Sequence, residues 1–184
     1  FQISPAETSV MPVVVSTIIL VLMLLMSALI SGSEVAFFSL GPADVEELEN
    51  SQNKSASVVV KLLDKPKALL ATILIANNFI NVAIIIVSTF LSTQIFPSDL
   101  SATAEFLINV VAITFLLLLF GEVIPKIEAT KNGMKMSLLM AKPLSVIGKV
   151  PPFSWLKVGL VKGTAVISNL GKVKSHNVST DELT

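Results

Sequence analysis

Three apolar stretches, each close to the thickness of a bilayer, constrain this 184-residue chain more than any other feature. They cover residues 13–30, 68–96 and 105–120, and only two serines and a threonine interrupt the first. A helix rises about 1.5 Å per residue, so the first stretch spans about 27 Å, roughly the hydrocarbon thickness of a bilayer. Only 14% of the residues are charged, against roughly 25% in a soluble domain. The prediction is an all-α integral membrane protein with three transmembrane helices.

The segment between the first two stretches, residues 41–67, is polar. It opens with Gly41 and Pro42, which end a helix, and four acidic residues follow where the next helix would begin. Acidic residues suit the positive end of a helix dipole. Residues 57–63 have the pattern of a second short amphipathic helix. We expect a pair of short cytoplasmic helices here, and a plain loop is the alternative.

The chain after Pro125 alternates apolar residues with lysines, and no lysine-free window there is long enough for a fourth span. Juxtamembrane amphipathic helices lying along the membrane interface are expected instead. The predicted organisation is an extracytoplasmic tail at 1–11, a transmembrane domain at 12–150, an interfacial amphipathic segment at 151–172 and a polar linker at 173–184.

The basic residues are distributed unevenly along the chain, and all 13 are lysines. Residues 1–12 and 97–104 contain none, residues 41–67 contain four, and the chain after Gly121 contains the other nine. If the chain crosses three times, every lysine lies on one side, which the positive-inside rule makes cytoplasmic. We expect a multi-pass protein of the plasma (inner) membrane, with its N-terminus outside and its C-terminus in the cytoplasm.

Composition argues against several other functions. The formal net charge is zero, whereas a nucleic-acid binder needs a basic excess. There is no cysteine, and the one histidine, His176, lies in the polar tail, so thiolate sites and histidine-based catalysis lack their residues. A serine nucleophile at Ser31 or Ser33 would have only Lys126 as a base. We therefore do not expect an enzyme.

Polar residues in or beside the apolar stretches fall into three groups, at 31–34, 77–81 and 121–126. Such residues are costly in lipid, so they usually face protein or a water-filled cavity. Asn77 and Asn81 are four residues apart and project from one helix face. Packing of small residues and asparagine bridges between helices are the alternative explanation for the first two groups.

The third group combines Gly121, Glu122, Pro125 and Lys126. A glycine followed four residues later by a proline predicts a broken helix, whose freed carbonyls need a cavity or an ion at membrane depth. An intrahelical ion pair between Glu122 and Lys126 is the alternative. Together the three groups supply hydroxyl, amide, carbonyl and carboxylate oxygens, which are ligands of hard cations such as Mg²⁺, Ca²⁺ and Na⁺.

In this order the three groups resemble the transmembrane domain of the CNNM/CorC family of magnesium transporters. The matching motifs are residues 30–34, 74–81 and 120–126. The resemblance implies a homodimer with three transmembrane helices per protomer, a pair of short cytoplasmic helices and a juxtamembrane helix. It also implies ATP-binding paired CBS modules beyond this chain, so residues 173–184 are expected to begin the linker toward them.

The resemblance further implies a Mg²⁺ site and Mg²⁺ export driven by Na⁺ entry. The metal ligands would be Ser31, Asn77, Asn81, Gly121 and Glu122. The leading hypothesis is alternating access in a homodimer, with the break at Gly121 allowing the third helix to rearrange. A passive channel, and a membrane anchor whose polar groups only pack helices, are the alternatives.

Overall fold

The three predicted spans are present as long apolar helices. The computed structural model describes residues 5–95, 101–151 and 153–163, and every regular element in those ranges is helical. Three helices in these ranges are long and apolar enough to cross a membrane: Val10–Phe38, Pro66–Ile95 and Phe106–Lys131. The predicted all-α membrane fold is confirmed.

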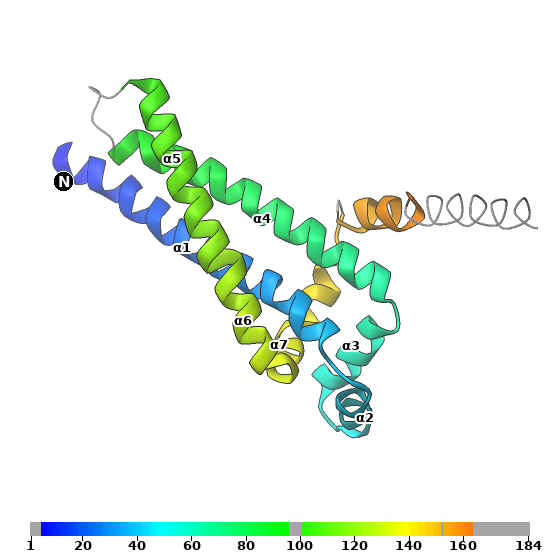
Figure 1. Cartoon of the computed structure of the whole chain (residues 1–184). Coiled ribbons are helices and arrows are strands. Elements are labelled where there is room, and N and C mark those ends of the chain that lie inside the picture. The colour runs from blue at the N-terminus through cyan, green and yellow to red at the C-terminus, as the bar shows by residue number, and fades with distance from the viewer. Residues whose placement is uncertain (1–4, 96–100, 152, 164–184) are drawn as a thin grey trace, which may run out of the picture.

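Helix α1 (Pro5–Phe38) lies at the centre of the bundle (Figure 1). It packs against α4 (Pro66–Ile95), the π-helix η1 (Leu117–Val123), α6 (Ile124–Lys131) and α7 (Gly133–Ile147). The helix continues without interruption through the polar residues 31–34. Its described part begins at Pro5, so part of the predicted 1–11 tail is helical.

The predicted pair of short helices is confirmed as α2 (Pro42–Asn50) and α3 (Lys54–Leu63). The carboxylate of Asp44 accepts the backbone N–H of Gly41 at 2.8 Å, which fixes the entry into α2. The side chain of Asn53 caps α3 by accepting a backbone N–H at 2.8 Å. These side chains stabilise two helix starts, and the segment is therefore not a plain loop.

The third span continues past the position where a break is predicted. Helix α5 (Ala102–Leu116) runs directly into η1, and η1 runs directly into α6. The predicted break at Gly121 is wrong, because the chain widens there into π-helical turns and stays helical. Pro125, which has no N–H to donate, falls in the first turn of α6, directly after the π-helical turns.

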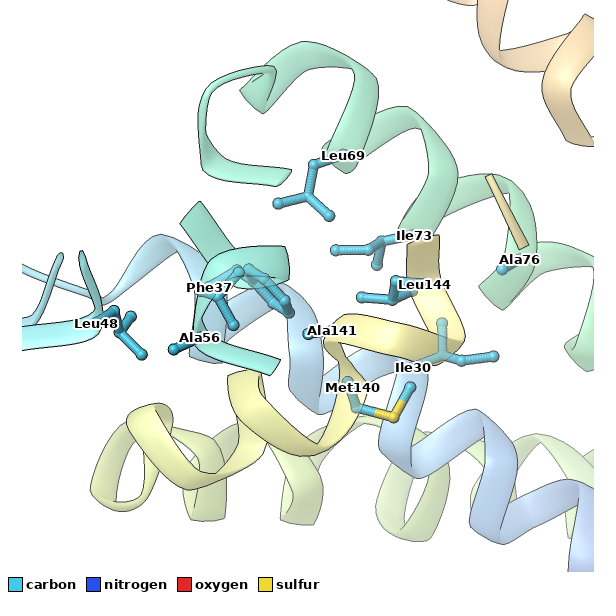
Figure 2. Close-up of a cluster of buried hydrophobic side chains, with 11 residues drawn as sticks. Ile30, Phe37, Leu48, Ala56, Leu69, Ile73, Ala76, Met140, Ala141 and Leu144 are labelled. Carbon is cyan, nitrogen blue, oxygen red and sulfur yellow. The ribbon is translucent and has the colours of Figure 1, made fainter. Parts of the chain in front are cut away.

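The main apolar core lies at one end of the bundle, where α2, α3 and α7 gather around the ends of α1 and α4 (Figure 2). All five helices contribute to it, and Phe37 of α1 is only 1% exposed. Its buried members are Ile30, Phe37, Leu48, Ala56, Val59, Leu69, Ile73, Ala76, Met140, Ala141 and Leu144. A second, smaller cluster of Ile84, Ile113 and Leu117 joins α4 to the third span.

The described lysines lie on α3, in the turn before α4, at the start of α4, on α6 and α7, and after α7. In Figure 1 these segments lie away from the N-terminus and from the start of α5, and we call this the lysine-rich end. The last described helix, residues 153–163, falls within the predicted juxtamembrane segment. Its Phe153 ring packs edge-on against Phe79 of α4, 5.4 Å between centroids. The predicted linker at 173–184 lies outside the described residues.

Candidate metal centre

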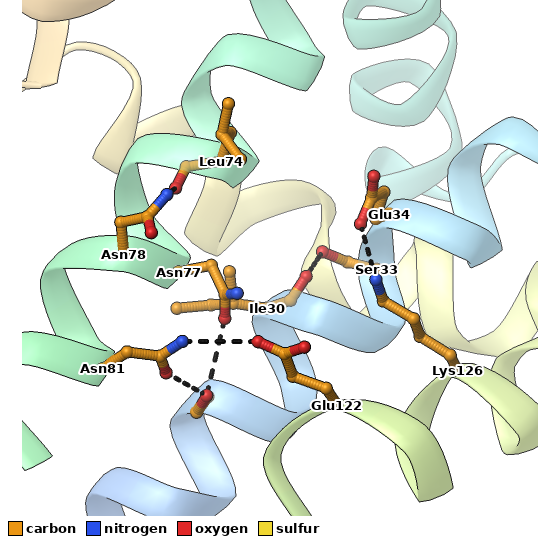
Figure 3. A network of polar contacts seen from close by, with 10 residues as sticks. Ile30, Ser33, Glu34, Leu74, Asn77, Asn78, Asn81, Glu122 and Lys126 are labelled. Carbon is orange, nitrogen blue, oxygen red and sulfur yellow. Dashed lines mark hydrogen bonds and ion pairs between the residues drawn. The ribbon is translucent and has the colours of Figure 1, made fainter. Parts of the chain in front are cut away.

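Polar side chains from three spanning helices meet inside the bundle (Figure 3). The hydroxyl of Ser27 on α1 donates to Oδ1 of Asn81 on α4 at 2.8 Å and lies 3.4 Å from Oδ1 of Asn77. Nδ2 of Asn81 donates to Oε1 of Glu122 on η1 at 3.5 Å. Ser27 is fully buried, and the other three residues are partly buried. We call these four residues the polar cluster.

The two asparagines of the polar cluster share one face of α4, as their four-residue spacing predicts. Their amide oxygens both point to the hydroxyl of Ser27. Asn78, rotated by about 100° around the helix, is exposed instead. Its Nδ2 donates to the carbonyl of Leu74 one turn earlier at 2.8 Å. Asn78 is therefore not part of the polar cluster.

Gly121 allows η1 to approach α1 closely. It is buried, and a Cβ added there would lie 3.1 Å from Oγ of Ser27. That separation is tighter than ordinary van der Waals contact, so a larger residue would displace Ser27 or the third span. Glycine at this position therefore lets the backbone of η1 reach the polar cluster.

The π-helical turns change the pairing of backbone oxygens beside the polar cluster. The N–H of Ile124 donates to the carbonyl of Leu119, five residues earlier. In that register the carbonyl of Phe120 would need the N–H of residue 125, which is a proline and has none. The carbonyl of Phe120, next to Gly121, thus lacks its usual helical donor. Turns of this π-helical kind are frequent at functional sites.

Ser31 is buried one turn from Ser27 on the same face of α1. Its side chain is 2% exposed, and its hydroxyl has no hydrogen-bond partner among the described residues. An unpaired buried hydroxyl is costly, so it marks a place for a water molecule or an ion. The structure thus brings four of the five predicted ligands together and leaves Ser31 one turn away.

Ser27 is the member of the polar cluster that its sequence context does not single out. It stands among aliphatic residues in the first apolar stretch. Its position four residues before Ser31 is the available signal, because that spacing places both on one helix face. Ser33, by contrast, turns away from the asparagines, and its hydroxyl donates to the carbonyl of Ile30 at 2.6 Å.

Lys126 pairs with Glu34 and not with Glu122. Its Nζ lies 3.2 Å from Oε2 of Glu34, and the two side chains are 40% and 41% exposed. The intrahelical alternative is therefore wrong, and the observed ion pair joins α6 to α1 (Figure 3). The carboxylate of Glu122 remains directed toward Asn81.

The polar cluster offers only oxygen atoms as ligands: one hydroxyl, two amide oxygens and one carboxylate. No group of three or more histidine, cysteine, aspartate or glutamate residues occurs in the described ranges. This donor set suits hard cations and is poor for Zn²⁺ or Cu²⁺. Glu122 is its one charged member.

Long apolar helices around a buried polar cluster define a multi-pass integral membrane protein. Residues 18–184 match the family model described as CNNM, the cyclin M transmembrane N-terminal domain. Because the match covers most of the chain, the chain belongs to the CNNM family. The resemblance based on the three polar motifs is confirmed.

Curated relatives include proteins from several bacteria. The chain is 32% identical over 168 residues to a UPF0053 protein of Haemophilus influenzae, covering 90% of this chain and 39% of the relative. It is 33% identical over 134 residues to the UPF0053 inner membrane protein YfjD of Escherichia coli K12, covering 71% of this chain and 29% of the relative. The chain thus spans less than half the length of these relatives.

Proposed function

We propose that this chain transports Mg²⁺ across the membrane, by Na⁺-coupled export with alternating access in a homodimer. The observation that carries the proposal is the polar cluster, in which oxygen-bearing side chains from three spanning helices converge inside an apolar bundle. Polar groups at membrane depth are costly and typically mark ion pathways. The lack of cysteine and the single histidine, His176, support transport over catalysis.

The chemistry of the polar cluster fits an ion that must bind and then leave. Mg²⁺ gives up its water reluctantly, so a site must replace that water with several oxygens. Ser27, Asn77 and Asn81 would supply neutral oxygens, and Glu122 would supply the one negative charge. A mostly neutral donor set keeps affinity moderate. The orphan hydroxyl of Ser31 is a further oxygen along the same face of α1.

Ion binding would replace the hydrogen bonds that now hold the polar cluster together. The contact between Asn81 and Glu122, at 3.5 Å, is at the long limit of a hydrogen bond and is easily given up. The widened turns of η1 place the most adaptable part of the third span beside Glu122. Alternating access would then need a rearrangement of η1 against α1, with the Na⁺ gradient as its energy source.

The proposed orientation places the lysine-rich end in the cytoplasm and the N-terminus outside, following the positive-inside rule. The Escherichia coli relative is described by its name as an inner membrane protein. We propose the plasma (inner) membrane for this chain as well. In this orientation the polar cluster would receive Mg²⁺ from the cytoplasmic side before export.

A membrane anchor is the second candidate function, and one observation favours it. The members of the polar cluster are hydrogen-bonded to one another, which a purely packing role also requires. The two functions differ in what a substitution does. Removing a packing contact lowers stability, whereas removing a ligand lowers Mg²⁺ flux in protein that still folds.

Mg²⁺ flux into vesicles containing the reconstituted protein distinguishes these functions, with Asn81→Ala as the test variant and Asn78→Ala as its control. Both substitutions remove an asparagine amide from α4, but only Asn81 belongs to the polar cluster. We expect Asn81→Ala to lower flux by about tenfold or more and Asn78→Ala to retain it. Equal flux in the wild type and Asn81→Ala would show that the cluster is not the transport site.

A further inference from the structure

A second polar site lies away from the polar cluster, at the lysine-rich end. It is a pocket of about 380 Å³ between α3, the start of α4, the end of α7 and the 153–163 helix. Four lysines line it: Lys61, Lys65, Lys149 and Lys157. They come from two stretches of the chain, residues 61–65 and 149–157, which the fold brings together.

The four lysines give the lining of the pocket a positive charge. No acidic residue is among its lining residues in the described part of the chain. The ion pair of Lys126 with Glu34 lies elsewhere, between α1 and α6. Like charges gathered without a counterion repel one another. An arrangement of this kind is best stabilised by a bound anion.

The elements that surround the pocket pack closely against one another. A Cβ added at Gly148 would lie 3.1 Å from Oγ1 of Thr72, so the end of α7 sits directly on α4. The ammonium group of Lys157 donates to the carbonyl of Gly148, which holds the last helix against the same point. Leu69 and Leu144, both in the main core, contribute to the apolar part of the lining.

The position of the pocket suits the headgroup level of a bilayer. Lys65 immediately precedes the second membrane span, which begins at Pro66. On the 153–163 helix, Trp155 is 72% exposed, and it lies with Leu156 along an apolar groove that also includes Ile75 of α4. Tryptophan is enriched at membrane interfaces. Basic pockets between spanning helices on the cytoplasmic side are typical sites for anionic headgroups.

We propose that this pocket binds a phosphate group, presented either by an anionic phospholipid headgroup or by free phosphate in solution. The four ammonium groups supply charge-assisted hydrogen bonds to its oxygens. Bound phosphate links α3, the start of α4, α7 and the 153–163 helix, and so stabilises the lysine-rich end. The proposal is independent of Mg²⁺ transport, because the pocket shares no residue with the polar cluster.

The test is thermal unfolding of the purified 184-residue chain in non-ionic detergent, with one of three additives. These are phosphatidylglycerol, phosphatidylcholine and inorganic phosphate. A ligand that binds only the folded state raises its stability. We expect phosphatidylglycerol, inorganic phosphate or both to raise the unfolding temperature by about 2–4 °C, and phosphatidylcholine to have a smaller effect. A rise in unfolding temperature with phosphatidylglycerol alone identifies the lipid as the source of the phosphate group. A rise with inorganic phosphate identifies free phosphate as a source.

The matched variants are the doubly substituted Lys61→Gln/Lys149→Gln and the control Lys131→Gln/Lys142→Gln. All four side chains are exposed, and each variant removes two charges, so folding should be preserved. We expect the stabilisation to disappear only in the pocket variant. The proposal is overturned if no phosphate additive stabilises the wild type, or if the control variant loses as much stabilisation as the pocket variant.

Discussion

The two halves of this bundle are packed differently. At the lysine-rich end, buried apolar residues from five helices form one continuous core. In the other half the described residues form only a small cluster, Ile84, Ile113 and Leu117. The long helices there turn large side chains outward, such as Leu22 and Val111 at 55% and 67% exposure. One half is held by its own core, and the other turns most of its large apolar side chains outward.

The polar cluster lies where these two regions meet. Asn77 directly follows Ala76 of the main core, and Asn81 lies one turn before Ile84 of the small cluster. On the third span, Gly121 lies one turn after Leu117. The asparagines therefore adjoin the main core, whereas η1, which carries Glu122, has only Leu117 and Gly121 buried. If the polar cluster binds an ion, we expect the third span to move more readily than α4.

The largest expected effect tests how much the main core contributes to the free energy of unfolding. Phe37→Ala should lower the free energy of unfolding by about 3–5 kcal/mol, because it removes a fully buried ring from the middle of the core. The neighbouring Phe38, 46% exposed, is the matched control, and Phe38→Ala should cost far less. Denaturant unfolding in detergent measures both. Similar losses would mean that the core does not dominate stability at this end.

The second prediction compares the two regions directly with one residue type. Ile73 is 2% exposed in the main core, and Ile113 is 5% exposed in the small cluster. Truncating a buried isoleucine to alanine costs about 2–5 kcal/mol, with the smaller values where the site can collapse. We expect Ile73→Ala near the top of that range and Ile113→Ala near the bottom, by denaturant unfolding. The reverse order would contradict the proposed difference in packing.

The third prediction concerns the boundary between the regions. Gly121→Ala places a Cβ about 3.1 Å from Oγ of Ser27, and the third span must move away to accept it. We expect Mg²⁺ flux to fall by about tenfold, a transition-state effect of roughly 1.4 kcal/mol. Gly159→Ala is the control, since a Cβ there meets nothing within 4 Å. Unchanged flux in Gly121→Ala would show that Mg²⁺ flux does not require the close approach of η1 to α1 at this glycine.

The smallest expected effect concerns the ion pair between the third span and α1. Lys126 and Glu34 are both about two-fifths exposed, and exposed pairs contribute at most about 1 kcal/mol. A double-mutant cycle with Lys126→Gln and Glu34→Gln should therefore give a coupling energy below about 1 kcal/mol. A larger coupling would mean that the third span is held more firmly than its sparse apolar contacts suggest.

Much of this architecture follows from local sequence signals. The length of the apolar stretches predicts the spans, and the acidic turn after Gly41 predicts α2. The four-residue spacing of Asn77 and Asn81 predicts their common face, because helix periodicity depends only on nearby residues. These features require no knowledge of how the helices pack.

The remaining features depend on packing between helices. Ser27 has no polar neighbour in sequence, and it joins the polar cluster only because α1 packs against α4. The glycine and proline around residues 121–125 predict a broken helix, and the helix continues there through π-turns instead. Lys126 has Glu122 at the favoured spacing, yet Glu34 on another helix is its partner.

The measurement that tests the central claim most directly is a Mg²⁺ titration of thermal stability in detergent, on the wild type, Ser27→Ala and Ser33→Ala. Both serines are buried on α1, but only Ser27 contacts the asparagines. We predict that Mg²⁺ raises the unfolding temperature of the wild type and Ser33→Ala, and much less that of Ser27→Ala. An equal rise in all three proteins, or none in the wild type, would contradict Mg²⁺ binding at the polar cluster.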